Sequence, residues 1–174
     1  SMPGDIPNAT AQLPNIGTCP NGDGNLRVGA DNGGGMDQDA WTEGSQAENV
    51  CFFGDLSGAG LITGISSPGQ PAFGQGLPLA KLGNGLVVAY ESMSPWKGLY
   101  AVTLEEMLNP SQATGTNAMT PGEAGQIDRK IDDGYSNTGA VLGVGVVGSC
   151  ENPSGDYAET VTSKDCDISY LLQQ

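Results

Sequence analysis

Residues 120–147, TPGEAGQIDRKIDDGYSNTGAVLGVGVV, contain the strongest local structural signals in the chain. Thr120 and Glu123 form the T-x-x-E pattern of a helix capping box, and a proline occupies the first helical position. Gly134 fits the glycine position after a helix C-terminus, and the valine-rich run that follows predicts a strand over 140–147. The apolar stripe of the predicted helix consists of Ala124, Ile127 and Ile131. The stretch therefore predicts a helix, a turn and a strand.

The charged residues at the end of this helix allow two interpretations. Asp128 and Asp132 lie one turn apart on the same helix face, which suits a carboxylate catalyst or a cation site. Asp132 and Asp133 also stand at a helix C-terminus, where the macrodipole disfavours anions, and Arg129 is placed to pair with Asp133. Their carboxylates should then accept hydrogen bonds from backbone N–H groups of residues 134–139 or from Lys130. We therefore expect a structural turn made by Asp128, Lys130, Asp132, Asp133 and Gly134.

The rest of the chain predicts short elements joined by long loops. An S-x-x-E pattern precedes apolar residues at helical spacing, which predicts a helix over 46–57. Two β-rich runs, 86–91 and 98–102, are separated by a loop of hairpin length, so they should pair antiparallel. A further capping-box pattern, TLEE, predicts a short helix over 103–110. The segment after Cys150 is polar.

Composition limits the classes of function. The 174 residues suffice for one domain, 1–174, and 28 glycines with 11 prolines favour a small sheet with long loops over a helical bundle. The net charge of −14 repels phosphate backbones, so no nucleic-acid partner is expected. The chain has no histidine, which removes histidine-dependent catalysis and the common zinc sites. We expect no catalytic residues and no enzyme; a carboxylate-based hydrolase is the distant alternative.

The four cysteines indicate disulfides. They show no C-x-x-C spacing, and their number is even in a loop-rich acidic chain, which indicates an oxidising compartment. Three pairings are possible, and four free thiols are the alternative. We favour the sequence-local pairing, because each such bridge would add roughly 3–4 kcal/mol and the second would close the polar C-terminal segment. The favoured pairs are Cys19–Cys51 and Cys150–Cys166.

Residues 21–28, NGDGNLRV, suggest a possible calcium loop. They offer oxygen ligands at alternate positions, and Ca²⁺ prefers several hard oxygens on a tight turn. The pattern is incomplete, because Leu26 stands where an EF-hand requires glycine. The alternative is a turn held by hydrogen bonds from side chains to the backbone. The candidate ligands are Asn21, Asp23, Asn25 and Asp31, with Asp37 or Asp39 as alternatives to Asp31.

Four stretches of the chain resemble a known family. They are PGDIPNAT at 3–10, NGDGNLRVG at 21–29, Glu48 with FGDLSGAGLI at 53–62, and TPGEAGQIDRKIDDGYSNTG at 120–139. In this order they resemble the globular domains of bacterial type IV pilin-like proteins, which include prepilin-type minor pilins and type II secretion pseudopilins. The resemblance spans about residues 3–147. Residues 30–35 and the loop around 63–80 depart from it.

The resemblance implies an α+β, pilin-like domain with a small antiparallel sheet, short helices and long disulfide-stapled loops. In that family P-G-D follows a long N-terminal helix, which is missing here and which would anchor the protein in the inner membrane before assembly. The expected partners are other pilin or pseudopilin subunits. The domain would be periplasmic first and extracellular or at the cell surface in the filament. No cofactor is required, although some relatives bind calcium. The alternative function is a surface adhesin or ligand-binding module with Trp96 in its contact loop.

Overall fold

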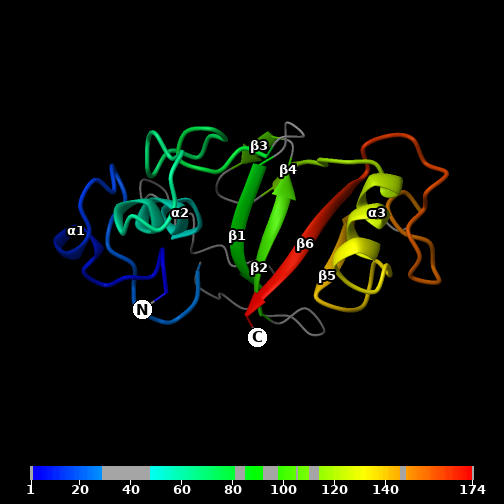
Figure 1. Cartoon of the computed structure of the whole chain (residues 1–174), viewed down its shortest axis with the longest axis horizontal. Coiled ribbons are helices and arrows are strands. Elements are labelled where there is room, and N and C mark those ends of the chain that lie inside the picture. The colour runs from blue at the N-terminus through cyan, green and yellow to red at the C-terminus, as the bar shows by residue number, and fades with distance from the viewer. Residues whose placement is uncertain are drawn as a thin grey trace.

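The centre of the fold is a four-stranded antiparallel sheet with the strand order β1-β2-β6-β5, as the computed structural model in Figure 1 shows. The structure describes residues 2–28, 48–80, 85–91, 98–104, 106–109, 114–145 and 148–173. The sheet strands are β1 (Gly85–Glu91), β2 (Gly98–Leu104), β5 (Val141–Gly145) and β6 (Cys166–Gln173). A small antiparallel sheet with short helices agrees with the predicted α+β class.

The predicted hairpin is confirmed, because β1 and β2 pair antiparallel with Val88 opposite Ala101. The predicted strand over 140–147 corresponds to β5, and residues 146–147 lie outside the described part. Strand β6 was not predicted. It occupies the centre of the sheet, where it pairs with β2 on one side and with β5 on the other.

The predicted helix over 103–110 is wrong. Strand β2 continues to Leu104, and β3 (Glu106–Asn109) pairs with β4 (Thr114–Thr116) in a separate two-stranded sheet. Thr103 does not cap a helix. Its hydroxyl instead accepts the N–H of Ile168 at 2.8 Å and lies 3.3 Å from the carbonyl oxygen of the same residue. The capping-box pattern is therefore overridden by pairing with β6, which lies more than 60 residues further along the chain.

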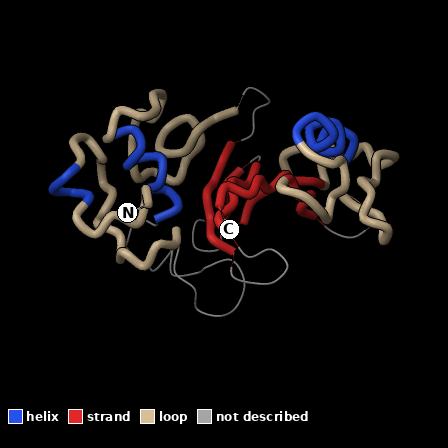
Figure 2. The backbone as a smooth tube through the Cα atoms, turned by 60° about the horizontal axis from the view of Figure 1, so that its bottom comes forward, coloured by secondary structure: helices blue, strands red, loops and turns tan. Residues whose placement is uncertain are grey.

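In the described part of the chain, the helices that flank the sheet are α1 (Ala9–Gln12), α2 (Glu48–Gly58) and α3 (Pro121–Ile131). Figures 1 and 2 show α1 and α2 beyond the β1 edge, and α3 at the opposite end, beside β5 and β6. Helix α2 agrees with the prediction over 46–57, although its expected capping box begins at Ser45, outside the described residues. No helix among the described residues is long and apolar enough to cross a membrane.

The interior is divided between the two ends of the sheet. One cluster packs α2 against β1 and β2 through Val50, Phe53 and Val87. The other packs α3 against β5 and β6 through Ala124 and Ile168. A disulfide lies at each end, and the two bridges are the favoured pairs, Cys19–Cys51 and Cys150–Cys166. The two disulfides indicate an extracytoplasmic location for the domain.

Backbone carbonyls from neighbouring loops accept N–H groups at both edges of the sheet. On the outer side of β1, the N–H of Leu86 donates to the carbonyl of Pro78 at 3.2 Å. The N–H of Tyr90 on the same strand donates to the carbonyl of Val28 at 3.1 Å. On β5, at the other edge, the N–H of Gly143 donates to a loop carbonyl at 2.8 Å.

Candidate functional site

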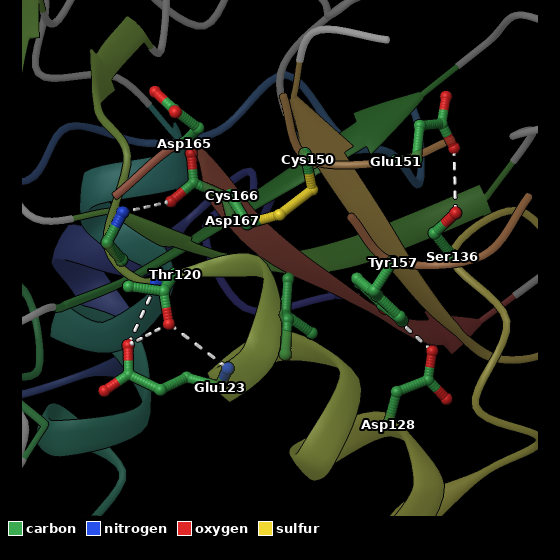
Figure 3. The surroundings of a disulfide bond; sticks show 12 residues. Thr120, Glu123, Asp128, Ser136, Cys150, Glu151, Tyr157, Asp165, Cys166 and Asp167 are labelled. Carbon is green, nitrogen blue, oxygen red and sulfur yellow. Dashed lines mark hydrogen bonds between the residues drawn. A yellow bond between two sulfur atoms is a disulfide. The ribbon is translucent and has the colours of Figure 1, made fainter. Parts of the chain in front are cut away.

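The predicted capping box at the start of α3 is confirmed. The N–H of Glu123 donates to Thr120 Oγ1 at 3.3 Å, and the N–H of Thr120 donates to Glu123 Oε2 at 2.9 Å (Figure 3). Pro121 occupies the start of the helix, as predicted. The N–H of Thr120 and its hydroxyl, which lies 3.0 Å from the same oxygen, hold the carboxylate in its charged form and so lower the pKa of Glu123. The box fixes the register of α3 and thereby the position of the acidic residues at its other end.

Asp128 is a fully buried carboxylate on the inner face of α3. Its Oδ1 accepts the N–H of Gly134 at 3.0 Å, and its Oδ2 accepts the hydroxyl of Tyr157 at 2.8 Å (Figure 3). Burial raises the pKa of Asp128, and the nearby charges of Asp132 and Asp133 raise it further. Burial and the bond to Asp128 also raise the pKa of Tyr157. The tyrosine therefore remains a neutral donor.

Asp132 and Asp133 bind the turn that joins α3 to β5. Asp132 Oδ2 accepts the N–H of Ala140 and, at 3.0 Å, the N–H of Val141. The two oxygens of Asp133 accept the N–H of Tyr135 at 2.9 Å and the hydroxyl of Thr138 at 2.7 Å. The bonds from Thr138 and Tyr135 lower the pKa of Asp133.

The sequence predicted that these two carboxylates accept hydrogen bonds from the following turn or from Lys130, and the positions of the donors agree only in part. The N–H of Tyr135, which donates to Asp133, is an expected donor, whereas the second donor to Asp133 is the side-chain hydroxyl of Thr138. The N–H groups that bind Asp132 lie just beyond the expected range, at 140 and 141. Within the described residues, Lys130 donates to neither carboxylate. The expected pair between Arg129 and Asp133 is also wrong, because Arg129 Nη1 lies 2.6 Å from Glu159 Oε1.

Two details of the helix end differ from the prediction. The C-cap is Asp132, so Gly134 lies one residue beyond the expected position, although its φ of +84° is left-handed as anticipated. A Cβ atom at Gly134 would lie 2.4 Å from Cγ of Arg129, so space as well as φ requires glycine there. Ile131, assigned to the apolar stripe, is the last residue of α3 and is 61% exposed.

The same turn receives the loop that precedes β6. Tyr157 and Glu159 of this loop bind Asp128 and Arg129 of α3. The hydroxyl of the buried Ser136 lies 2.8 Å from both Glu151 Oε2 and the carbonyl of Gly155. The Cys150–Cys166 disulfide closes the loop beside this contact (Figure 3). The acidic residues thus join α3, β5 and the C-terminal loop.

A second group of carboxylates lies at the N-terminal end of the domain. Asp5 is fully buried, and its two oxygens accept the N–H groups of Gly24 at 2.5 Å, Asn25 at 3.1 Å and Leu26 at 2.7 Å. Burial raises the pKa of Asp5, the bonds from Leu26 and Gly24 oppose this rise, and the neighbouring Asp23 adds to it. Asp5 thereby fixes the course of the predicted calcium loop.

The described members of the predicted calcium loop accept hydrogen bonds from the chain. Asn21 Oδ1 accepts the N–H and the hydroxyl of Thr10, both at 3.0 Å. Asp23 Oδ1 accepts the N–H of Asn25 at 2.8 Å, and Asn25 Oδ1 accepts the N–H of Arg27 at 2.8 Å. These are the side-chain-to-backbone bonds of the alternative interpretation. Asp31 and its alternatives at 37 and 39 lie outside the described residues.

Among the described residues, two acidic groups have ligand atoms within 4.8 Å of one another: Asp5 with Asp23 and Glu48, and Asp128 with Asp132 and Asp133. Ca²⁺ requires six to eight oxygens, and several oxygens of these residues, such as Asp5 Oδ1 and Asp132 Oδ2, already accept hydrogen bonds from the chain. Calcium binding by this domain therefore stays a prediction.

Comparison with family models, curated proteins and solved structures found no match. The site is therefore interpreted from its own geometry.

The roles of Asp5 and Asp55 were not predicted from the sequence, although both residues lie in stretches that carry the family resemblance. Asp55 Oδ2 accepts the N–H of Gly4 at 2.8 Å, and Asp55 is only 2% exposed. A single aspartate gives no periodic signal, so its burial was not predictable from spacing. Residues 93–96, with the candidate adhesin residue Trp96, lie outside the described part.

Proposed function

We propose that the chain is a structural subunit of a type IV pilus or a type II secretion-like pseudopilus, which exposes this domain on the filament. The observation that carries the proposal is that the aspartates in the family-like stretches bind backbone of the domain. Asp5, Asp55, Asp128, Asp132 and Asp133 all accept hydrogen bonds from backbone N–H groups. The motifs therefore connect segments of the domain.

The chemistry of these bonds favours a structural protein over a hydrolase. A carboxylate hydrolase needs one carboxylic acid and one carboxylate facing a common substrate site. Asp128 and Asp132, the pair with suitable helical spacing, each accept two donors from the chain itself. Their oxygens are thus engaged in holding the turn and the C-terminal loop.

The location of the disulfides supports the same proposal. Cys19–Cys51 ties the N-terminal segment to α2, and Cys150–Cys166 ties the C-terminal loop to the central strand β6. An extracytoplasmic domain stapled at both ends suits a subunit exposed to the medium. The proposed partners are other pilin or pseudopilin subunits and, before assembly, the inner membrane, through an N-terminal helix preceding Pro3.

The test uses the native gene with an epitope tag, expressed in hosts with and without the prepilin peptidase. We expect cleavage of the precursor and recovery of the tagged protein in sheared filaments only in the peptidase-positive host. A cytoplasmic protein expressed from the same promoter controls for cell lysis. A tagged protein that leaves the cell identically in both hosts, through a conventional signal peptide, would contradict the proposal.

A further inference from the structure

Asp55 differs from the other buried aspartates in how its carboxyl group is satisfied. One oxygen accepts the N–H of Gly4 at 2.8 Å. The other oxygen, Oδ1, is buried and has no hydrogen-bond partner in the described structure. Asp5 and Asp128, by contrast, accept bonds at both oxygens. A buried polar atom without a partner requires a physical explanation.

The N-terminal segment and α2 are in close contact beside Asp55. Gly4 has a φ of +84°, and a Cβ atom built on it would lie 2.5 Å from the carbonyl oxygen of Glu48 and 3.3 Å from the backbone nitrogen of Phe52. The N-terminal segment therefore lies directly on the backbone of α2. Asp55, one turn further along the helix than Phe52, receives the Gly4 N–H inside this contact.

The charged groups of the packed elements do not compensate a charge on Asp55. The N-terminal segment contributes Asp5, whose oxygens bind residues 24–26. Helix α2 contributes Glu48, which accepts the N–H of Asp23 at 3.1 Å. These groups are all acidic.

The loop over residues 19–28 contributes the only described cation of these elements, Arg27, whose guanidinium carbon lies 5.0 Å from the ring centre of Tyr90. Among the described residues, no cation forms an ion pair with Asp55. Burying an ionised carboxylate with one donor and no cation is unfavourable, whereas the protonated acid avoids that cost.

We propose that Asp55 makes the packing of the N-terminal segment on α2 proton-dependent: the packing is more stable with the neutral acid and loses stability when the buried acid ionises, although the Gly4 N–H bond itself favours the charged form. Burial raises the pKa of Asp55, and the bond from Gly4 offsets only part of this rise. The stabilisation is therefore fully present below the ordinary pKa of aspartate, and it is lost as the pH rises through the pKa of the folded state. The domain would hold its N-terminal segment more tightly in acidic surroundings than at neutral pH.

The test compares urea unfolding of the wild type and Asp55→Asn between pH 4 and pH 8. Asparagine has the shape of the neutral acid and does not titrate, so it removes the pH dependence that Asp55 contributes. The quantity compared is the ratio of the unfolding equilibrium constant of the wild type to that of the variant. We expect this ratio to increase with pH by at most tenfold per pH unit and then to level off. A ratio that stays constant across this range contradicts the proposal, because it shows a carboxylate that remains ionised, for example with a buried water as its second partner.

The matched control is Asp133→Asn, an exposed aspartate whose pKa is lowered by Thr138 and Tyr135. Its stabilisation is present above the ordinary aspartate pKa and is lost only as the pH falls below that value, so between pH 4 and pH 8 its ratio should change little and should not increase with pH. If Asp55→Asn does not fold, the carboxyl carbon of Asp55 is titrated by NMR in the wild type. A midpoint at or below that of an exposed aspartate overturns the proposal.

Discussion

Replacement of Tyr157 by phenylalanine tests whether the α3 joint is held by its buried carboxylate. The change removes one hydroxyl, which donates to Asp128 Oδ2 at 2.8 Å. Asp128 is fully buried and Tyr157 is 4% exposed, so water does not readily replace the lost donor. Hydrogen bonds to charged groups contribute about 1.5–3 kcal/mol, so we expect the free energy of unfolding to fall by about 2 kcal/mol at pH 8. In a domain of this size that corresponds to a decrease in Tm of about 4–8 °C.

The pH dependence makes this prediction more specific. The hydroxyl of Tyr157 stabilises the ionised form of Asp128, so its removal raises the pKa of Asp128 further above the ordinary value. A raised carboxyl pKa removes stability as the pH increases. The loss caused by Tyr157→Phe should therefore be largest at pH 8 and should shrink as the pH falls toward 4. Thermal melts followed by circular dichroism measure both quantities.

Two controls separate this mechanism from loss of packing. Tyr135→Phe changes a tyrosine of the same turn that is 51% exposed, and it should alter the free energy of unfolding by less than about 0.5 kcal/mol. In an Asp128→Asn background, Tyr157→Phe removes only a neutral hydrogen bond, so its effect should fall to about 1 kcal/mol and lose its pH dependence. An equal loss at every pH, in both backgrounds, would refute the reasoning.

Three further predictions concern other parts of the structure. Gly4→Ala should destabilise the domain by about 1–2 kcal/mol for its left-handed backbone, with a further 1–3 kcal/mol or so for the clash with α2. Gly60→Ala, at φ +71° with open space around it, should show only the first effect in urea unfolding, and equal losses would contradict the close contact. Removing the Cys19–Cys51 pair by alanine should cost about 4 kcal/mol and removing Cys150–Cys166 about 3 kcal/mol, because the first closes 32 residues and the second 16; the opposite order would argue against the loop-entropy explanation. Because the oxygens of Asn21, Asp23 and Asn25 already accept hydrogen bonds, EDTA should leave Tm unchanged, whereas a Tm that rises with added Ca²⁺ would show a bound metal.

Sequence patterns predicted the elements whose stabilising contacts join residues close in the sequence. The capping box of α3 and the β1–β2 hairpin depend on residues close in sequence, and both are present. The pattern at Thr103 has the same letters as a capping box, but its hydroxyl binds Ile168 in β6, and a one-dimensional pattern does not show that contact.

Strand β6 was missed although its sequence contains a signal. Cys166, Ile168 and Tyr170 alternate with the polar residues Asp167 and Ser169, which is the two-residue period of a strand with one apolar face. The overall polarity of the segment after Cys150 obscured this alternation.

The structural role of the acidic residues at the end of α3 was predictable from the sequence, but their partners in the C-terminal loop were not. Unfavourable charge at a helix C-terminus indicated that Asp132 and Asp133 must be satisfied locally, and they are. The partners of Asp128 and Arg129 come from the C-terminal loop, about 30 residues away, so spacing along α3 gave no information about them.

The loop carbonyls along the edges of the central sheet have a consequence at high protein concentration. An edge strand with free N–H groups recruits strands from other molecules and leads to aggregation. Here Pro78 and Val28 take up N–H groups of β1, and Ser136 takes up that of Gly143 in β5. These bonded N–H groups are not available to a strand of a neighbouring copy, so the loops reduce the tendency of the sheet edges to pair between molecules.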